Sequence, residues 1–93
     1  MDVGRSPAGS DELREIERYV GDVWASVLGL PRVAPEDNFF ELGGHSLNAL
    51  QMLLRLHDRF GVQVDLADLY DVPVLRELTE LLWQRLSHGL KPV

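Results

Sequence analysis

The sequence predicts an all-α fold, a small four-helix bundle of right-handed type with three long helices, one short helix and a long loop between helices 1 and 2. Two observations carry this prediction. Apolar residues recur every three or four positions in successive segments, the spacing that places them on one face of a helix. No segment alternates apolar and polar residues convincingly, as a half-buried strand does. The 93 residues fit a single domain.

The first helix is predicted to start near Ser10 or Asp11, to run for about 18 residues, and to end at Gly29 and Pro31. Residues 1–10 are rich in Gly, Pro and Ser and predict a flexible N-terminal lead-in. The apolar face of this helix consists of Leu13, Ile16, Val20, Val23, Trp24 and Val27.

A second helix is predicted over residues 46–60, ending at Gly61, and a short one over residues 66–70 after the cap Asp65. The last helix is predicted over residues 74–86, so that the domain spans residues 11–88 and residues 89–93 form a C-terminal tail. The side on which Met52 lies is left open. The inward face of the second helix is predicted to hold Ala49, Leu50, Leu53, Leu56 and Phe60.

The connection from Gly29 to His45 is 17 residues long. Irregular loops longer than about 12 to 15 residues are uncommon in small domains unless they are functional or disordered. This loop has its own apolar side chains, so we expect it to pack on the bundle and to hold its last residues in a fixed place. The apolar side chains are Val33, Phe39, Phe40 and Leu42.

Composition excludes several function classes. The formal net charge of −6 disfavours binding to nucleic acid or to an anionic membrane surface. Without cysteine there is no disulfide, no thiolate zinc site and no cysteine nucleophile. No apolar stretch approaches the roughly 20 residues that span a bilayer. We therefore expect a soluble, cytoplasmic protein that binds or carries rather than catalyses.

The junction between the long loop and the second helix carries the chemistry. Gly43 and Gly44 leave little bulk before Ser46, and a serine at a helix start meets free backbone N–H groups that favour a phosphate. Alternatively, Ser46 is only the N-cap of the helix. The nucleophile pattern Gly-x-Ser-x-Gly fails because Asn48 stands at its last position, and the three histidines lack metal-ligand spacing. No catalytic residue and no metal ligand is assigned.

The sequences LGLP at residues 28–31 and DNFFELGGHSL at residues 37–47 resemble the peptidyl carrier (thiolation) domains of nonribosomal peptide synthetases. The similarity extends from about Leu13 to Leu86. It implies a monomeric, non-catalytic carrier. Ser46 would receive 4′-phosphopantetheine from coenzyme A through a magnesium-dependent phosphopantetheinyl transferase. The arm would carry aminoacyl or peptidyl thioesters between adenylation, condensation, thioesterase or tailoring enzymes.

The resemblance also assigns roles around Ser46. The glycines would keep the approach open, His45 and Leu47 would flank the modified serine, Asp37 would belong to the loop motif, and Phe39 and Leu42 would pack. Helical spacing places Leu47, Gln51 and Leu54 on an outer stripe. The predicted partner-binding residues are Gly43, Gly44, His45, Leu47, Asn48, Gln51, Leu54 and Arg55.

Two alternatives remain: a polyketide or other acyl carrier protein, and a helical docking module without an arm. Residues 43–60 carry a local charge of +1, from Arg55 and Arg59 against Asp58, whereas fatty-acid carriers have a markedly acidic second helix. This favours a peptidyl carrier. One departure from the family is that residues 72–75 lack the hydroxyl that often caps the last helix, so that Asp71 or Pro73 is expected to start it differently.

Overall fold

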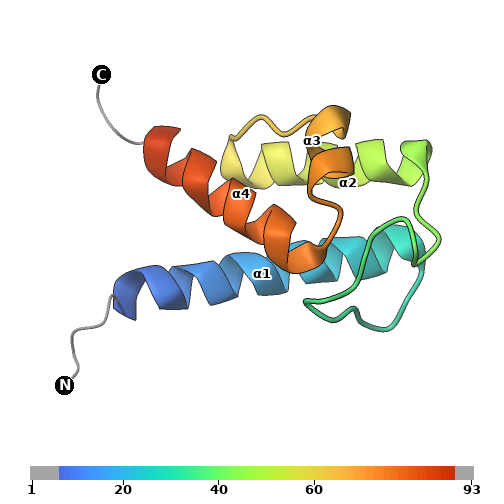
Figure 1. The fold of residues 1–93 in the computed structure, drawn as a ribbon, viewed down its shortest axis with the longest axis horizontal. Coiled ribbons are helices and arrows are strands. Elements are labelled where there is room, and N and C mark those ends of the chain that lie inside the picture. Colours follow the sequence, from blue (N-terminus) through green and yellow to red (C-terminus); the bar gives the residue numbers. More distant parts are fainter. Residues whose placement is uncertain (1–6, 90–93) are drawn as a thin grey trace.

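Four helices and their connecting loops make up the part of the chain that the computed structural model describes, residues 7–89, with side chains described for residues 11–87 (Figure 1). The helices are α1 (Pro7–Leu28), α2 (Ser46–Phe60), α3 (Leu66–Asp71) and α4 (Leu75–Gly89). Residues 7–89 contain no strand, and the predicted fold of three long helices and one short helix is confirmed. Helix α1 contacts both α4 and α2, and α3 lies against α2.

The helix ends differ slightly from the prediction. Helix α1 begins at Pro7, earlier than the expected start near Ser10 or Asp11, and proline suits the first helical position because its fixed φ matches the helix. Residues 7–10 of the predicted lead-in are therefore helical, and residues 1–6 lie outside the described residues. Gly29 ends α1 with a φ of 70°, as predicted. Helix α4 continues to Gly89, so that only residues 90–93 of the predicted tail lie outside the description.

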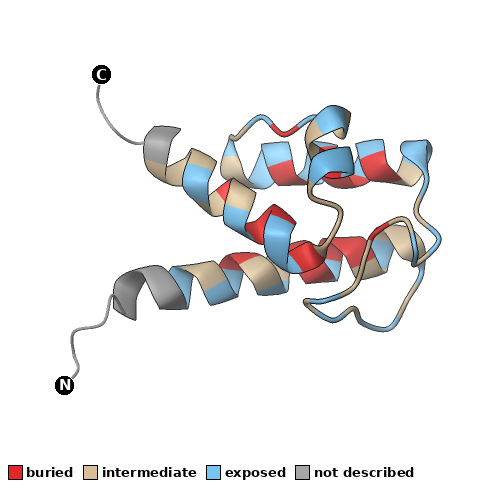
Figure 2. Cartoon of the chain, in the orientation of Figure 1, coloured by how far each residue is buried: buried red, intermediate tan, exposed pale blue. Residues whose placement is uncertain are grey.

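The core lies where the helices face one another, and the buried residues of Figure 2 follow these inner faces. Met52, whose side the sequence left open, is fully buried. Thr79 is a buried polar residue, and its hydroxyl donates a hydrogen bond to the Leu75 carbonyl at 2.8 Å, so its polar group is satisfied. The fully buried apolar residues are Val20, Trp24, Phe39, Ala49, Met52, Leu56, Leu69, Leu78 and Leu82.

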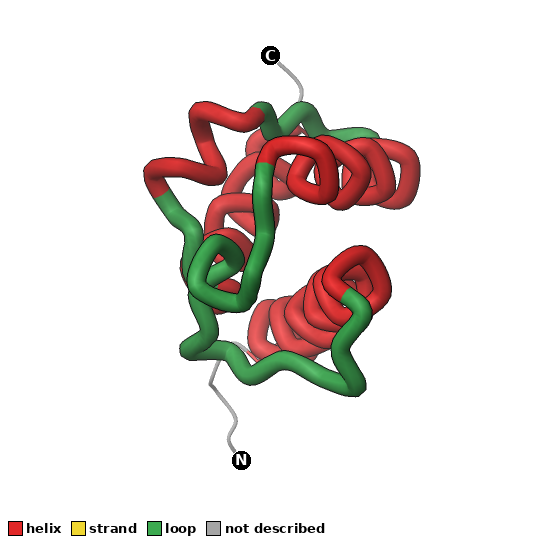
Figure 3. Tube along the Cα trace, turned by 90° about the vertical axis from the view of Figure 1, so that its right-hand side faces the viewer, coloured by secondary structure: helices red, strands yellow, loops and turns green. Residues whose placement is uncertain are grey.

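The long loop between α1 and α2 is part of the core. It runs from the end of α1 past the start of α4 and back to α2 (Figure 3). Phe39 is fully buried, and its ring meets Trp24 edge to face, with the ring centroids 5.1 Å apart. The expectation that this loop packs on the bundle is confirmed. Its path ends at Ser46, whose position is therefore set by core packing.

The same loop caps the N-terminus of α4. The backbone N–H of Leu75 donates to the Asp37 carbonyl at 3.0 Å, and that of Arg76 donates to the Pro35 carbonyl at 2.9 Å. These two N–H groups are among those that a helix cannot satisfy within itself. The expected start at Asp71 or Pro73 is wrong, because Asp71 ends α3 and α4 begins at Leu75. Backbone carbonyls of the loop thus replace the missing hydroxyl cap.

Helix α3 is held by a charged contact to α4. The Arg85 guanidinium donates to both carboxylate oxygens of Asp68, at 2.7 and 3.1 Å, and also to the Gln63 carbonyl at 2.8 Å. The hydrogen bonds from Arg85 to the carboxylate are the main cause that lowers the pKa of Asp68 to about 2. Asp65 caps α3 as predicted, because its side chain accepts from the Asp68 N–H at 3.0 Å. One arginine therefore ties α4 to both the short helix and the segment before it.

Candidate functional site

A tight turn leads from the buried Phe39 to the start of α2. The Asn38 side chain accepts hydrogen bonds from the N–H groups of Phe40 and Glu41, at 2.9 and 3.2 Å. Gly43 has a φ of 101°, a conformation that side-chain-bearing residues rarely adopt, so glycine is required there. The turn folds back on itself and exposes its last residues.

Gly44 is required for a different reason. Its N–H donates to the Phe39 carbonyl at 3.0 Å, which brings the two backbones together. A Cβ on Gly44 would lie 2.7 Å from that carbonyl oxygen and would overlap the Phe39 ring. Because Phe39 is buried, its ring has no room to move away. The conformation of the turn thus requires both glycines, apart from their predicted role of keeping the approach to Ser46 open.

His45 is the N-cap of α2, and Ser46 is its first helical residue. The interpretation of Ser46 as the N-cap is therefore wrong. The N–H of His45 donates to the Asn48 side chain at 2.7 Å, which is the half of a capping box that ties the N-cap to the third helical residue. Asn48, predicted to bind partners, thus also has a structural role.

The Ser46 side chain is exposed, and its hydroxyl has no hydrogen-bond partner among the described residues. It stands at the N-terminal end of α2, where the free N–H groups and the helix dipole favour a negative charge. An exposed hydroxyl without a partner, at this end of a helix, fits the attachment of a phosphate ester. No group of three or more His, Cys, Asp or Glu among the described residues is arranged to hold a metal ion.

Three leucines of α2 are exposed on its outer side. Leu47 and Leu54, expected on the outer stripe, are 63% and 68% exposed. Leu50 was expected inside and is 47% exposed, so that assignment is wrong. The two leucines Leu50 and Leu54 line a groove of about 290 Å³ against the segment that precedes α3. Helical spacing alone did not show which of Leu50 and Met52 faces the core, because α2 contacts both α1 and α3 and the burial of each residue depends on these contacts.

The remaining predicted partner-binding residues lie on the same helix. Gln51 and Arg55 are exposed, and the Arg55 guanidinium donates to the Ser26 hydroxyl of α1 at 3.1 Å. Tyr70 was not predicted as a surface feature, yet it is 57% exposed and its ring stacks on Phe40 at a centroid distance of 5.0 Å. Because Phe40 and Tyr70 are far apart in the sequence, no local pattern indicated this contact.

The chain is similar to known proteins of one family. Residues 18–82 match the family described as "Phosphopantetheine attachment site". A peptidyl carrier protein solved in complex with the phosphopantetheine transferase Sfp and coenzyme A has 30% sequence identity and a TM-score of 0.73, over 75% of this chain and 91% of that chain. The chain belongs to the peptidyl carrier domains of the phosphopantetheine attachment family.

Other relatives of this carrier domain are much longer proteins. Gramicidin S synthase 2 of Brevibacillus brevis is 38% identical over 68 residues, which are 73% of this chain and 2% of that protein. The McyG A-PCP structure, complexed with phenylalanyl-adenylate, is 41% identical with a TM-score of 0.70, over 73% of this chain and 11% of that chain. The chain therefore spans only a small part of the length of these two relatives.

None of the helices within residues 7–89 combines the length and the apolar character needed to cross a membrane.

Proposed function

We propose that Ser46 carries a 4′-phosphopantetheine arm and that the domain carries aminoacyl or peptidyl thioesters between enzymes of nonribosomal peptide biosynthesis in the cytoplasm. The observation that carries this proposal is the exposed, unpartnered hydroxyl of Ser46 at the first residue of α2. Membership of the phosphopantetheine attachment family supports it.

The attachment step needs little from the carrier domain beyond presentation of the hydroxyl. The Ser46 oxygen forms a new phosphoester bond while a phosphoanhydride bond of coenzyme A breaks. The hydroxyl proton passes to a base of the transferase, and the nucleotide part of coenzyme A leaves with the electron pair of the broken bond. The turn at Gly43 and Gly44 has no side chains that would obstruct a transferase. The new phosphate lies at the positive end of α2.

The bound arm supplies a thiol, which this cysteine-free chain lacks. The domain is a substrate of its partner enzymes and performs no catalysis itself. Because the arm is attached covalently to Ser46 at the start of α2, the cargo stays near each bound partner at a high effective concentration. We include among the partners a transferase and adenylation, condensation, thioesterase or tailoring enzymes.

The partner surface that we propose surrounds Ser46 on the outer side of α2. Leu47 and Leu54 offer exposed apolar area, and Gln51 and Arg55 offer polar groups beside it. Exposed apolar side chains that gather at one place on a small domain are typical of interaction sites. Leu50, exposed at the same side, extends this surface toward α3.

Intact-mass measurement after incubation with coenzyme A, Mg²⁺ and a promiscuous phosphopantetheinyl transferase tests the attachment. We expect the mass of one arm to be added to the wild type and none to Ser46→Ala. Ser87→Ala provides a matched control, because it removes a serine hydroxyl from a different helix, α4, and should leave the modification intact. An unmodified wild type, or a modified Ser46→Ala, would contradict the proposal.

The cargo separates a peptidyl carrier from a polyketide or other acyl carrier. We expect an amino-acid-activating adenylation enzyme to load the modified domain and an acyltransferase of polyketide synthesis not to load it. The opposite result would favour the acyl carrier.

A docking module without an arm would bind its partners equally well with Ser46→Ala, whereas the carrier should lose all transfer of cargo.

A further inference from the structure

The structure describes seven arginine side chains, and those without a partner gather in one place. Four are engaged: Arg55 with Ser26, Arg59 over the rings of Tyr19 and Phe60, Arg76 with Glu36, and Arg85 with Asp68. The guanidinium groups of the other three have no ion pair or hydrogen bond to any described residue. These three, Arg14, Arg18 and Arg32, line a single groove.

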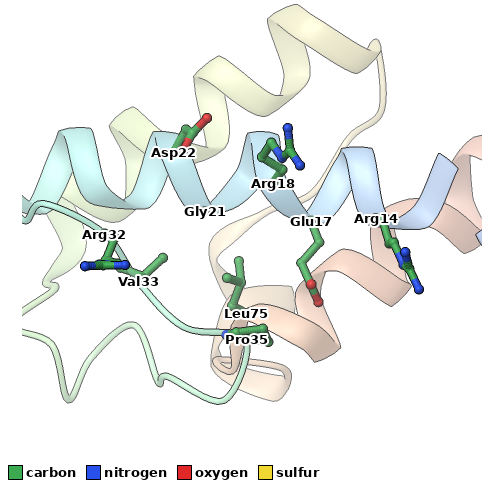
Figure 4. A pocket seen from close by; sticks show the side chains of 9 residues that line it. All are labelled: Arg14, Glu17, Arg18, Gly21, Asp22, Arg32, Val33, Pro35 and Leu75. Carbon is green, nitrogen blue, oxygen red and sulfur yellow. The ribbon is translucent and has the colours of Figure 1, made fainter. Parts of the chain in front are cut away.

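The groove lies between α1 and the first part of the long loop (Figure 4). Its volume is about 320 Å³, within the range of about 300 to 1,000 Å³ typical of ligand pockets. Apolar groups line its interior, from Val33 and Pro35 of the loop and Leu75 at the start of α4. None of the residues predicted to act around Ser46 lines it.

The groove has a net positive charge, although the whole chain is negative. The chain has a net charge of −6, whereas the groove has three arginines against Glu17 and Asp22, a local balance of +1. Arg14 and Arg18 are four residues apart on α1, and like charges at that spacing destabilise a helix. Because none of the three guanidinium groups pairs with a described residue, they are available to an anion.

Gly21 leaves space at the bottom of the groove. Glycine inside a helix is unfavourable relative to alanine. A Cβ at Gly21 would lie 3.4 Å from both the Leu75 and the Val33 side chains, which is ordinary van der Waals contact. Alanine would thus fit this position, and glycine is not needed to avoid a clash. Its absent side chain deepens the groove.

We propose that this groove binds a short extended peptide segment of a partner protein in which carboxylates flank an apolar side chain. The apolar side chain lies against Val33 and Leu75, and the carboxylates pair with the guanidinium groups, whose planar donors match carboxylates well. Charge complementarity selects this partner over a basic or purely apolar peptide. Because the groove shares no residue with the surface around Ser46, the partner holds the domain while Ser46 stays accessible.

Fluorescence anisotropy with a labelled peptide containing Glu-Leu-Asp-Leu-Glu tests the proposal, with Gln-Leu-Asn-Leu-Gln as the neutral comparison. We expect the acidic peptide to bind about tenfold more tightly at low salt and to lose this advantage at high salt. Amide chemical shifts should change at the groove residues. Arg18→Gln and Arg32→Gln should each weaken binding about two- to fivefold. Arg59→Gln, on another face, should not.

Gly21→Ala removes space without changing charge. We expect it to weaken peptide binding while leaving the fold intact, which amide spectra would show. Equal binding of the acidic and neutral peptides, or shifts that map outside the groove, would overturn the proposal. Competition by free glutamate at the same carboxylate concentration would also overturn it, because the groove would then be a small-anion site. The result is independent of the modification of Ser46.

Discussion

At the level of single residues, the presentation of Ser46 depends on neighbours that never touch its hydroxyl. Gly44 lies directly on Phe39, and Asn48 binds the backbone of His45. Both residues hold the turn and the first turn of α2 in one arrangement. The exposed serine thus depends on buried and backbone contacts on either side of it.

Gly44→Ala should be more disruptive than Gly43→Ala. The first change forces a Cβ into the Phe39 ring and carbonyl, and overpacking of this kind costs about 1 to 3 kcal/mol. The second change strains only the backbone, because a Cβ on Gly43 would meet nothing within 4 Å. Since Phe39 contacts Trp24, only Gly44→Ala should shift the indole N–H resonance of Trp24. Equal shifts in both variants would contradict this reading of the turn.

Asn48→Ala should lower the free energy of unfolding by about 0.5 to 2 kcal/mol, because the His45 N–H loses its acceptor. Asn48→Asp keeps an acceptor and should remain within a few tenths of the wild type. Urea denaturation midpoints measure the change in stability of both variants. If the two variants were equally destabilised, the capping hydrogen bond would not be the cause.

At the level of secondary-structure elements, the loop and the short helix are both held by α4. Loop carbonyls accept the first N–H groups of α4, and Arg85 near its other end binds Asp68 of α3. Helix α4 therefore connects the segment that presents Ser46 with the segment beside the exposed leucines of α2.

The Asp68–Arg85 pair should make stability depend on pH in the acid range. The pKa of Asp68 is lowered to about 2 in the folded state, so its contribution is present above the unfolded pKa of about 4 and is lost as the pH falls toward 2. We expect Arg85→Met to remove about 1 to 2 kcal/mol at pH 7, because Arg85 is partly exposed and the full shift is screened. The difference between variant and wild type should shrink as the pH falls toward 2, to the part that comes from the hydrogen bond to the Gln63 carbonyl, which does not titrate.

Arg76→Met is the matched control for this measurement. Its partner Glu36 is largely exposed, with a side-chain exposure of 68%, and such pairs contribute about 0 to 1 kcal/mol. Thermal denaturation from pH 2 to pH 7 would compare the two. A pH dependence in the wild type that persists unchanged in Arg85→Met would contradict the assignment to Asp68.

At the level of the whole molecule, the long loop is as much a part of the core as the helices. Phe39→Ala should cost about 3 to 5 kcal/mol, like the truncation of a large side chain in a helical core, because Phe39 is fully buried against Trp24. Phe39→Leu should be milder and keep the fold measurable. Leu54→Ala, at a position 68% exposed, should change stability by less than about 0.5 kcal/mol. Chemical denaturation would rank the three variants by their free energies of unfolding.

Much of the site could be predicted because its signals are local. The periodic apolar residues located the four helices, the glycine pair indicated a special turn, and Ser46 stands where a loop meets a helix. The ends of α1, α3 and α4 differ from the prediction by one to several residues, whereas α2 has its predicted bounds, because helix ends depend on the backbone and loops around them. The exposure of Ser46 required the structure, because a serine where a loop meets a helix is often the N-cap, and only the structure shows that His45 is the N-cap here.

The sequence by itself determined the all-α class, the packing of the long loop and the place of Ser46, because helical periodicity and glycine conformations are properties of neighbouring residues. Tertiary structure alone decided that Leu50 faces out while Met52 is buried, that loop carbonyls cap α4, and that three unpaired arginines share a groove. Each of these depends on which elements meet across the bundle. Contacts between residues far apart in the chain leave no periodic signal in either segment.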